Sequence, residues 1–206
     1  ALQALRDLYE EVAQREARLA QLGAKKVTRA LAQKHPELRP LVALFSECHE
    51  LFGHEEFGKE AADLAVQTMR RGRKTAITLG FDTQSSRADA IPPKIVELVK
   101  INACFAVKAW RSNDGFLGDG SFQAGIRATE LRPGKDVGTS ILTGATEERF
   151  EILKWFYIEA DDDTGYDAAV AVIERAMTYL GSEIAHAAAH QTDGEGQEKR
   201  DLLADV

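Results

Sequence analysis

"LVALFSECHELF" (residues 41–52) decides the fold, because an apolar run over residues 41–45 ends abruptly in Ser46 and Glu47. Short apolar runs bounded by polar residues are typical of strands in parallel sheets, which are buried on both faces. We therefore expect a strand over 41–45 that is covered on both sides. The carboxylate that follows is notable, since ligands of open α/β sheets bind beyond the carboxyl ends of the strands.

Helix and strand patterns alternate on either side of this stretch. Apolar residues at helical spacing predict helices over 2–22, 25–34, 58–72, 92–100 and 165–181, and β-rich runs predict strands over 75–82, 103–110, 138–144 and 149–160. The alternation predicts an α/β fold with a mostly parallel sheet and helices on both faces, followed by a C-terminal strand pair and helix. Residues 112–125 are expected to form a glycine-rich loop.

The composition is that of a globular protein, with 206 residues, 44% hydrophobic and 29% charged. We expect one domain over 1–181 and a polar linker over 182–206, toward a possible following domain. A net charge of −7 argues against a general polyanion-binding surface. No apolar run is long enough to cross a bilayer. Cys48 and Cys104 are interpreted as reduced, buried thiols, which predicts a cytoplasmic location.

A second strand end carries polar side chains that suit the same chemistry. "TLGFDTQSS" (78–86) ends in Thr83 and Gln84, whose amide can hydrogen-bond a terminal phosphate or a water. Glu47, at the other strand end, can orient or deprotonate an attacking water. The alternatives are that Glu47 merely caps a helix and that Gln84 merely satisfies loop backbone.

Four cations gather in "MRRGRK" (69–74), at the entry of the second strand. A charge run of this kind is usually a solvated face. Because the cluster lies at the amino end of its strand, away from the site of its own subunit, it can assist chemistry only across a subunit boundary, in a ring.

Together these stretches resemble the second half of the motor domain of FtsK/SpoIIIE/HerA-type DNA translocases. That family has an apolar strand ending in Asp-Glu, a helix ending in a cation cluster, a strand ending in Ala-Thr-Gln-Arg-Pro-Ser and an Ile-Pro-x-x-Ile helix. The resemblance covers residues 5–160, and the strand ends are most similar to actinobacterial TraB-like members. It implies a RecA-like P-loop NTPase fold.

The resemblance also implies roles for individual residues. Glu47 matches the Walker B glutamate that activates water, Gln84 the glutamine that senses the γ-phosphate, and Arg73 the arginine offered to the neighbouring subunit. Thr83 and Ser46 would lie against the nucleotide, with ATP and Mg²⁺ as cofactors. Ser46 departs from the family, which has a Mg²⁺-binding Asp there, and a hydroxyl holds Mg²⁺ only weakly or through water.

The sequence contains no GxxxxGK[ST] motif, so the phosphate-binding loop of such a motor is missing. Two interpretations stay open. In the first, the chain is a piece whose parent carries an N-terminal P-loop portion, and the piece alone is inactive. In the second, it is a degenerate pseudo-ATPase that acts as a scaffold or ring subunit.

The partners that the resemblance implies are double-stranded DNA and further copies of the chain in a hexameric ring. The process would be chromosome segregation in cell division or conjugative plasmid transfer, and the parent would be cytoplasmic or membrane-anchored. Candidate DNA contacts are Arg127, Arg132 and Lys135, which are equally interpretable as ordinary surface charge. A sequence-specific DNA-binding module is disfavoured, because no recognition-helix pattern is present and the chain is acidic.

Overall fold

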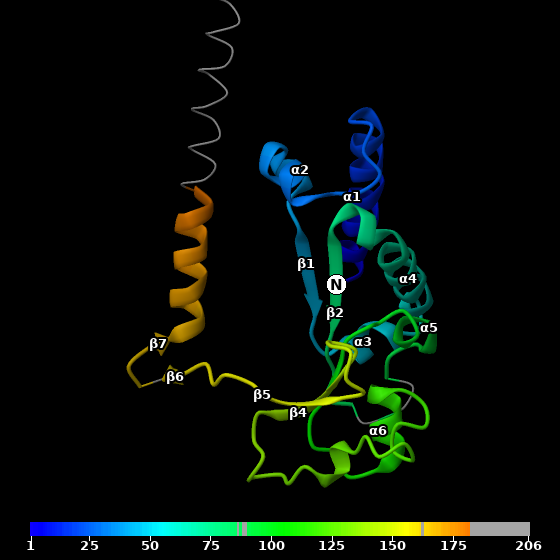
Figure 1. Cartoon of the computed structure of the whole chain (residues 1–206), viewed down its shortest axis with the longest axis vertical. Helices are drawn as coiled ribbons and strands as arrows, with labels where there is room; N and C mark the ends of the chain where they lie inside the picture. Colours follow the sequence, from blue (N-terminus) through cyan, green and yellow to red (C-terminus); the bar gives the residue numbers. More distant parts are fainter. Residues whose placement is uncertain (86, 88–89, 162, 182–206) are drawn as a thin grey trace, which may run out of the picture. The chain divides into compact units, whose positions relative to one another are not determined.

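The computed structural model of the chain describes residues 1–85, 87, 90–161 and 163–181. The chain divides into two compact units, Ala1–Trp155 and Phe156–Val206, which are described separately. Figure 1 shows the helices and strands with their labels. Both strand ends that the sequence singles out belong to the first unit.

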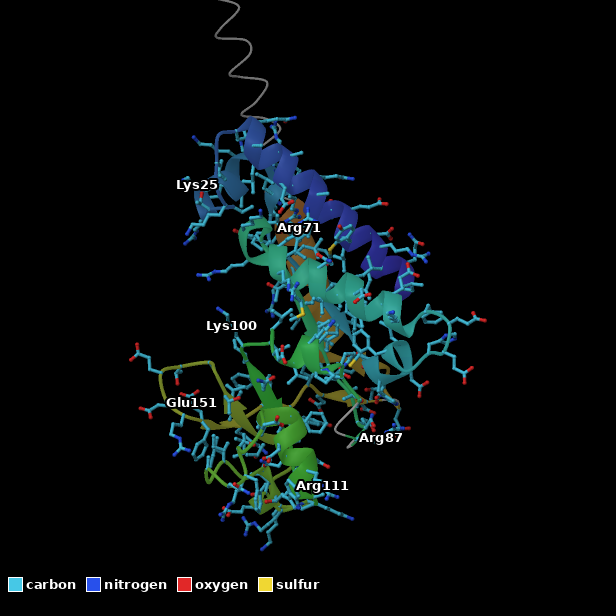
Figure 2. The ribbon with its side chains drawn as sticks, turned by 90° about the vertical axis from the view of Figure 1, so that its right-hand side faces the viewer. Lys25, Arg71, Arg87, Lys100, Arg111 and Glu151 are labelled. Carbon is cyan, nitrogen blue, oxygen red and sulfur yellow. The ribbon has the colours of Figure 1, made fainter. Side chains whose placement is uncertain are left out.

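The first unit begins with α1 (Leu2–Gln21), which buries a stripe of residues at helical spacing, namely Leu5, Leu8, Val12, Arg15 and Leu19. This stripe packs against α4 (Gly58–Thr75), which runs alongside α1 in Figure 2. A short α2 (Arg29–Lys34) follows, where the Thr28 hydroxyl caps the first turn by accepting from the Leu31 N–H. The single turn η1 (Pro36–Leu38) then leads into the first strand.

The first strand, β1 (Leu41–Phe45), pairs in parallel with β2 (Ile77–Phe81), so that Leu41 lies opposite Ile77 and Phe45 opposite Phe81. The connection between them consists of α3 (Cys48–Phe52) and α4. Alternate strand residues face α1 and α4 and form the main core with them, namely Leu41, Ala43, Phe45, Ile77, Leu79 and Phe81. Gly72 permits the close return of the chain, since a Cβ there would lie 2.3 Å from the Ile77 carbonyl oxygen.

The other face of β1 is bare, so the expectation of a strand buried on both faces is wrong. Val42 and Leu44 are 66% and 77% exposed. The sequence does not reveal this, because their side chains are as apolar as those that point inward. Among the described residues the parallel sheet consists of β1 and β2, and no helix covers the face that carries Val42 and Leu44. The α/β class is confirmed, whereas helices on both faces are not found there.

The remaining elements of the first unit are α5 (Pro93–Val96), β3 (Asn102–Cys104), α6 (Trp110–Leu117), η2 (Ala128–Glu130), β4 (Thr139–Thr143) and β5 (Glu151–Lys154). The three strands form an antiparallel sheet in the order β3-β4-β5. The predicted pairing of 138–144 with 149–160 is thus confirmed in shorter form. The predicted strand over 103–110 is corrected: β3 is shorter and antiparallel to β4, and it does not extend the parallel sheet.

The expected loop over 112–125 begins inside α6, and polar side chains explain the difference. Asn113 is fully buried; its amide donates to the Ile126 carbonyl oxygen at 3.0 Å and its Oδ1 accepts from the Ala128 N–H at 2.7 Å. Asp114 accepts from the Phe122 N–H at 2.8 Å. These residues, which usually signal a turn, instead tie the following loop onto the helix.

The second unit contains a short antiparallel pair, β6 (Ala160–Asp161) and β7 (Tyr166–Asp167). A helix over 168–181 follows and confirms the predicted C-terminal helix, although it begins later than the predicted 165. The predicted linker over 182–206 lies outside the described residues.

Cys48 and Cys104 are both free and buried, as the sequence predicts. Burial raises the pKa of the Cys48 thiol to about 11 and that of Cys104 to about 12, so both are protonated at neutral pH. In the part of the chain that the structure describes, every helix is too short or too polar to span a membrane.

Candidate functional site

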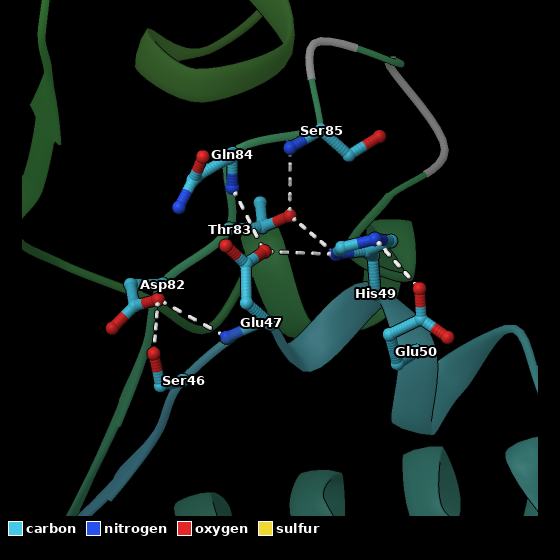
Figure 3. Close-up of polar contacts among 8 residues, drawn as sticks. All are labelled: Ser46, Glu47, His49, Glu50, Asp82, Thr83, Gln84 and Ser85. Carbon is cyan, nitrogen blue, oxygen red and sulfur yellow. Dashed lines mark hydrogen bonds and ion pairs between the residues drawn. The ribbon is translucent and has the colours of Figure 1, made fainter.

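The carboxyl ends of β1 and β2 lie side by side and are joined by backbone hydrogen bonds beyond the strands themselves. The Asp82 N–H donates to the Phe45 carbonyl oxygen at 3.1 Å, and the Cys48 N–H donates to the Asp82 carbonyl oxygen at 3.0 Å. The polar residues that follow each strand are therefore held at one edge of the sheet, where Figure 3 shows them close together.

Glu47 adopts a left-handed backbone conformation, with φ 49° and ψ 44°, at the turn from β1 into α3. This conformation costs a residue other than glycine about 1–3 kcal/mol. The turn aims the Glu47 carboxylate toward the neighbouring strand end, where its Oε2 accepts a hydrogen bond from the Gln84 backbone N–H at 3.1 Å. Backbone strain and a cross-strand hydrogen bond thus place one carboxylate between the two strand ends (Figure 3).

Gln84 leaves its side chain available at this edge. Its backbone N–H contacts Glu47, whereas its exposed side-chain amide makes no hydrogen bond to any residue that the structure describes. Thr83 has a different task, because its Oγ1 accepts from the Ser85 N–H at 3.0 Å and lies 2.9 Å from the His49 Nδ1. The Thr83 hydroxyl therefore shapes the start of the loop after β2.

His49 joins the two strand ends, a role that the sequence did not indicate. Its Nδ1 lies 3.2 Å from the Glu47 Oε2 as well as near Thr83, and its Nε2 lies 3.3 Å from the Glu50 Oε1. The ring stands on the first turn of α3 and is 30% exposed. His49 thus restricts the rotamers that the Glu47 side chain can adopt.

Ser46 is paired with the carboxylate of Asp82, for which the linear sequence pattern indicates no role. Its Oγ donates to the Asp82 Oδ1 at 3.0 Å, and the Glu47 N–H donates to the same oxygen at 3.1 Å. Asp82 stands directly after β2, one residue before Thr83. Once the register is known, the position of Asp82 beside Ser46 follows directly, because Phe45 and Phe81 are partners.

The edge carries negative charge. The raised pKa of Cys48 is caused first by burial, and the Asp82 and Glu47 carboxylates raise it further. A free polyphosphate is repelled by such an edge, whereas a divalent cation is attracted. A nucleotide would therefore approach this edge together with its metal ion, with positive groups supplied from elsewhere.

A neighbouring cavity of about 530 Å³ does not suit a phosphate group. It is lined by His49, Glu50, Gly53, His54, Glu55 and Glu56. Its three glutamates would repel a polyanion. Unlike this hollow beyond α3, the strand-end edge combines the Glu47 acid with the unbound side-chain amide of Gln84.

Arg73 is not part of this edge. It is an exposed residue in the last turn of α4, next to the amino end of β2, and it has no partner among the described residues. Since a strand rises about 3.3 Å per residue, the length of β2 separates Arg73 from the edge by more than about 13 Å. Arg73 is therefore not placed to act at the edge of its own chain.

The three candidate DNA contacts lie on the loops between α6 and β4, and two of them are paired within the chain. Arg127 binds Glu130 at 3.2 Å and stacks over the Phe122 ring, and Arg132 binds Asp136 at 3.1 Å. Lys135 is exposed and its ammonium group has no partner in the described part of the chain.

The donor set at the edge fits Mg²⁺. Its side chains offer carboxylate and hydroxyl oxygens, the ligands that Mg²⁺ prefers, and Mg²⁺ at nucleotide sites takes only one or two carboxylates, with phosphates and waters completing its shell. The described residues contain no group of three or more His, Cys, Asp or Glu side chains arranged to hold a metal ion by themselves. The edge thus suits a metal that arrives with a phosphate ligand.

No family model and no curated protein matches the sequence. In fold, the chain is similar to the conjugation coupling protein TcpA of pCW3, solved in a monomer form with ATPγS, with a TM-score of 0.64 at 19% identity. It is also similar to the cytoplasmic domain of the type VII secretion ATPase EccC of Thermomonospora curvata, with a TM-score of 0.61 at 19% identity.

Each likeness covers 84% of this chain, which spans 48% of the TcpA chain and 20% of the EccC chain. The chain therefore shares the fold of part of the TcpA chain and of part of the EccC chain.

Proposed function

We propose that this chain is the second half of an ATP-hydrolysing motor domain, in which Glu47 activates water and Gln84 senses the γ-phosphate. The observation that carries the proposal is the placement of the Glu47 carboxylate against the Gln84 backbone N–H at 3.1 Å, on neighbouring parallel strand ends. The Glu47 carboxylate and the residue that carries the side-chain amide thus lie on adjacent strand ends, where an acid and an amide together can hold one water in line with a terminal phosphate.

Within this site Glu47 acts as the group that takes the proton of the attacking water. The side-chain amide of Gln84 hydrogen-bonds the γ-phosphate. When hydrolysis removes this phosphate, the hydrogen bond is lost, and this change is passed on to the loop that follows β2. Thr83 and Ser46 lie next to the nucleotide, and the Thr83 hydroxyl keeps the loop in place. Ser46 would lie beside a Mg²⁺ that arrives with ATP, and this metal would neutralise the charge that builds up on the phosphates.

The P-loop comes from another portion of the parent protein, since this chain has no GxxxxGK[ST] motif. The bare face of β1, with Val42 and Leu44 exposed side by side, supports this view, because a contiguous apolar patch is typical of a surface that another part of a protein covers. A P-loop portion that packs on this face and extends the sheet completes a RecA-like core.

Arg73 then completes the site of a neighbouring subunit in a ring, which we propose to be a hexamer. Its exposure and its lack of a partner among the described residues support this role. An arginine supplied across a subunit boundary stabilises the charge of the transition state, so turnover depends on assembly.

The proposed substrate that the motor moves is double-stranded DNA. The process would be chromosome segregation or conjugative transfer, at a cytoplasmic location. The TcpA structure is described as a conjugation coupling protein, which favours transfer. Lys135 is the best placed of the three candidate contacts, since its charge is uncommitted, whereas Arg127 and Arg132 are engaged by acids. Phosphate contacts of this kind supply affinity without sequence preference.

The test uses the full-length protein that carries the P-loop portion. ATPγS binding and ATP hydrolysis, with and without duplex DNA, are measured side by side. Hydrolysis that duplex DNA stimulates supports the motor. Nucleotide binding without hydrolysis, under conditions in which the ring assembles, contradicts it and supports the pseudo-ATPase scaffold.

A further inference from the structure

The carboxylates at the strand-end edge differ in how many of their oxygens already have a hydrogen-bond or ion-pair partner. The Glu47 Oε2 accepts from the Gln84 N–H and lies 3.2 Å from the His49 ring. Glu50 faces the other ring nitrogen of His49, away from β2. Asp82 uses only its Oδ1, and its Oδ2 makes no hydrogen bond within the described residues.

The geometry points to Asp82 as the metal ligand of this site: we propose that its carboxylate, with the Ser46 hydroxyl beside it, binds the Mg²⁺ that accompanies ATP. The inference rests on the proposed function, since the metal needs phosphate ligands. It adds a residue to which neither the resemblance nor the sequence assigns a role. The acid that holds the metal is thus supplied by β2 and not by β1.

The physical basis is the charge that Mg²⁺ requires. A neutral hydroxyl such as that of Ser46 cannot replace the hydration shell of Mg²⁺ by itself, and an anionic oxygen is needed. Asp82 provides this oxygen within hydrogen-bonding distance of Ser46, at 3.0 Å. Because the Ser46 hydroxyl donates its proton to Asp82, the lone pairs of its oxygen stay available for the metal or a metal-bound water.

The local backbone holds Asp82 in this position. Its N–H donates a hydrogen bond to the Phe45 carbonyl oxygen, and its Oδ1 also accepts from the Glu47 N–H at 3.1 Å. These contacts orient the carboxylate so that Oδ2 is directed away from the backbone of β1, as Figure 3 shows. The Asp82 side chain is solvent-exposed, so a hydrated metal ion has access to it.

The register of the two strands explains why these two side chains meet. Ser46 and Asp82 each follow directly after one of the register partners Phe45 and Phe81. The hydroxyl from the end of β1 and the carboxylate from the end of β2 therefore lie next to each other at the edge.

The competing explanation is that Asp82 is purely structural, an acceptor that caps the Glu47 N–H. Asp82→Asn separates the two roles, because the amide oxygen still accepts from Ser46 and Glu47 while the negative charge is lost. The double variant Ser46→Asp/Asp82→Ala is the complementary test, since it places the carboxylate at the end of β1 in place of the end of β2. Asp63→Asn, which removes an exposed acid from α4, controls for net charge.

Mn²⁺ binding to the full-length protein is monitored by electron paramagnetic resonance in the presence of ATPγS. The affinity for ATPγS is measured separately in EDTA. We expect Asp82→Asn to weaken Mn²⁺ binding about 10- to 100-fold. Metal-free nucleotide affinity should not fall, and Asp63→Asn should match the wild type. The double variant should regain most of the Mn²⁺ affinity that Asp82→Ala loses.

Unchanged Mn²⁺ binding in Asp82→Asn, with ATPγS still bound, overturns the metal role of Asp82 and leaves the proposed function intact. A double variant that binds Mn²⁺ as weakly as Asp82→Ala also contradicts the proposal that a carboxylate at this edge holds the metal. This comparison requires that both variants unfold at the same temperature. If the wild type binds no ATPγS with or without metal, the proposed function fails, and this inference fails with it.

Discussion

The Gln84 backbone N–H donates to the Glu47 carboxylate across two neighbouring strand ends, at 3.1 Å. This contact brings together residues that are 37 positions apart in the chain. It leaves the Gln84 side chain unbound in the described structure, and it orients the carboxylate whose proton transfer the proposed mechanism requires.

Replacing Glu47 with Gln should abolish turnover and spare nucleotide binding. The amide keeps an oxygen that can accept from the Gln84 N–H but cannot take a proton, so kcat should fall about 10²- to 10⁴-fold. Steady-state ATPase assays and ATPγS titration of the full-length protein measure the two effects. Glu55→Gln, an exposed neighbour, is the control. Turnover close to that of the wild type would remove Glu47 from the mechanism.

His49 should act through the position of Glu47. Asn places a polar atom near the Nδ1 site, which contacts Glu47 and Thr83, whereas Gln reaches only toward the Nε2 site near Glu50. We expect His49→Ala and His49→Gln to lower kcat about tenfold or more, with KM little changed, and His49→Asn to recover most of the loss. Equal kcat values for the Asn and Gln variants would show that the Nδ1 contacts do not matter.

Arg73→Ala should lower turnover about a thousandfold or more in the assembled ring, because an arginine supplied in trans stabilises transition-state charge. Arg70→Ala is the matched control, since Arg70 is also exposed on α4 and precedes Arg73 by one helical turn. Mixing Arg73→Ala subunits with Glu47→Gln subunits should restore partial activity, because some interfaces then have both groups. No recovery in mixed rings that assemble normally would exclude a role in trans.

The contact between α1 and α4 should make stability depend on pH. Hydrogen bonds from Arg71, and then from Lys74, lower the pKa of Glu16 from 4.5 to about 2. Because the folded pKa is the lower one, the stabilisation is complete above pH 4.5 and is lost as the pH falls toward 2. Arg71 also stacks over the Tyr9 ring.

Accordingly, Glu16→Gln should reduce the free energy of unfolding by about 1 kcal/mol at pH 7, a modest value for a pair open to solvent. The difference from the wild type should shrink through the acid range. Urea unfolding at a series of pH values measures it, with Glu10→Gln, an exposed residue of α1, as the control. A difference that stays constant down to pH 2 would mean that the ion pair does not stabilise the fold.

The sequence predicted the elements that depend on local pattern. The stripe of α1, the helix before β2 and the strands around Leu41 and Ile77 were placed within a few residues. It did not show which faces are covered, because Val42 and Leu44 are as apolar as their buried neighbours. It also missed α6, where the buried Asn113 and the neighbouring Asp114 hold the following loop through hydrogen bonds that depend on the folded chain.

In the candidate site, too, the local sequence pattern predicts some residues and misses others. Glu47 and Gln84 were selected because each follows an apolar run, and the structure places them in contact. Asp82 and His49 were not selected, since their importance depends on which residues lie across from them. Parallel pairing brings Asp82 to Ser46, and the first turn of α3 brings His49 to Thr83. Neither proximity is visible in a linear motif.

The register of Phe45 with Phe81 also bears on how this chain's relatives evolve. Under the proposed metal role of Asp82, positions 46 and 82 serve one function together, so a mutation at one should be tolerated once the other has changed. Related sequences with a hydroxyl at the first position should therefore carry an acid at the second. An alignment that treats the two columns as independent would then count two inactivating losses where a single charge has changed its position.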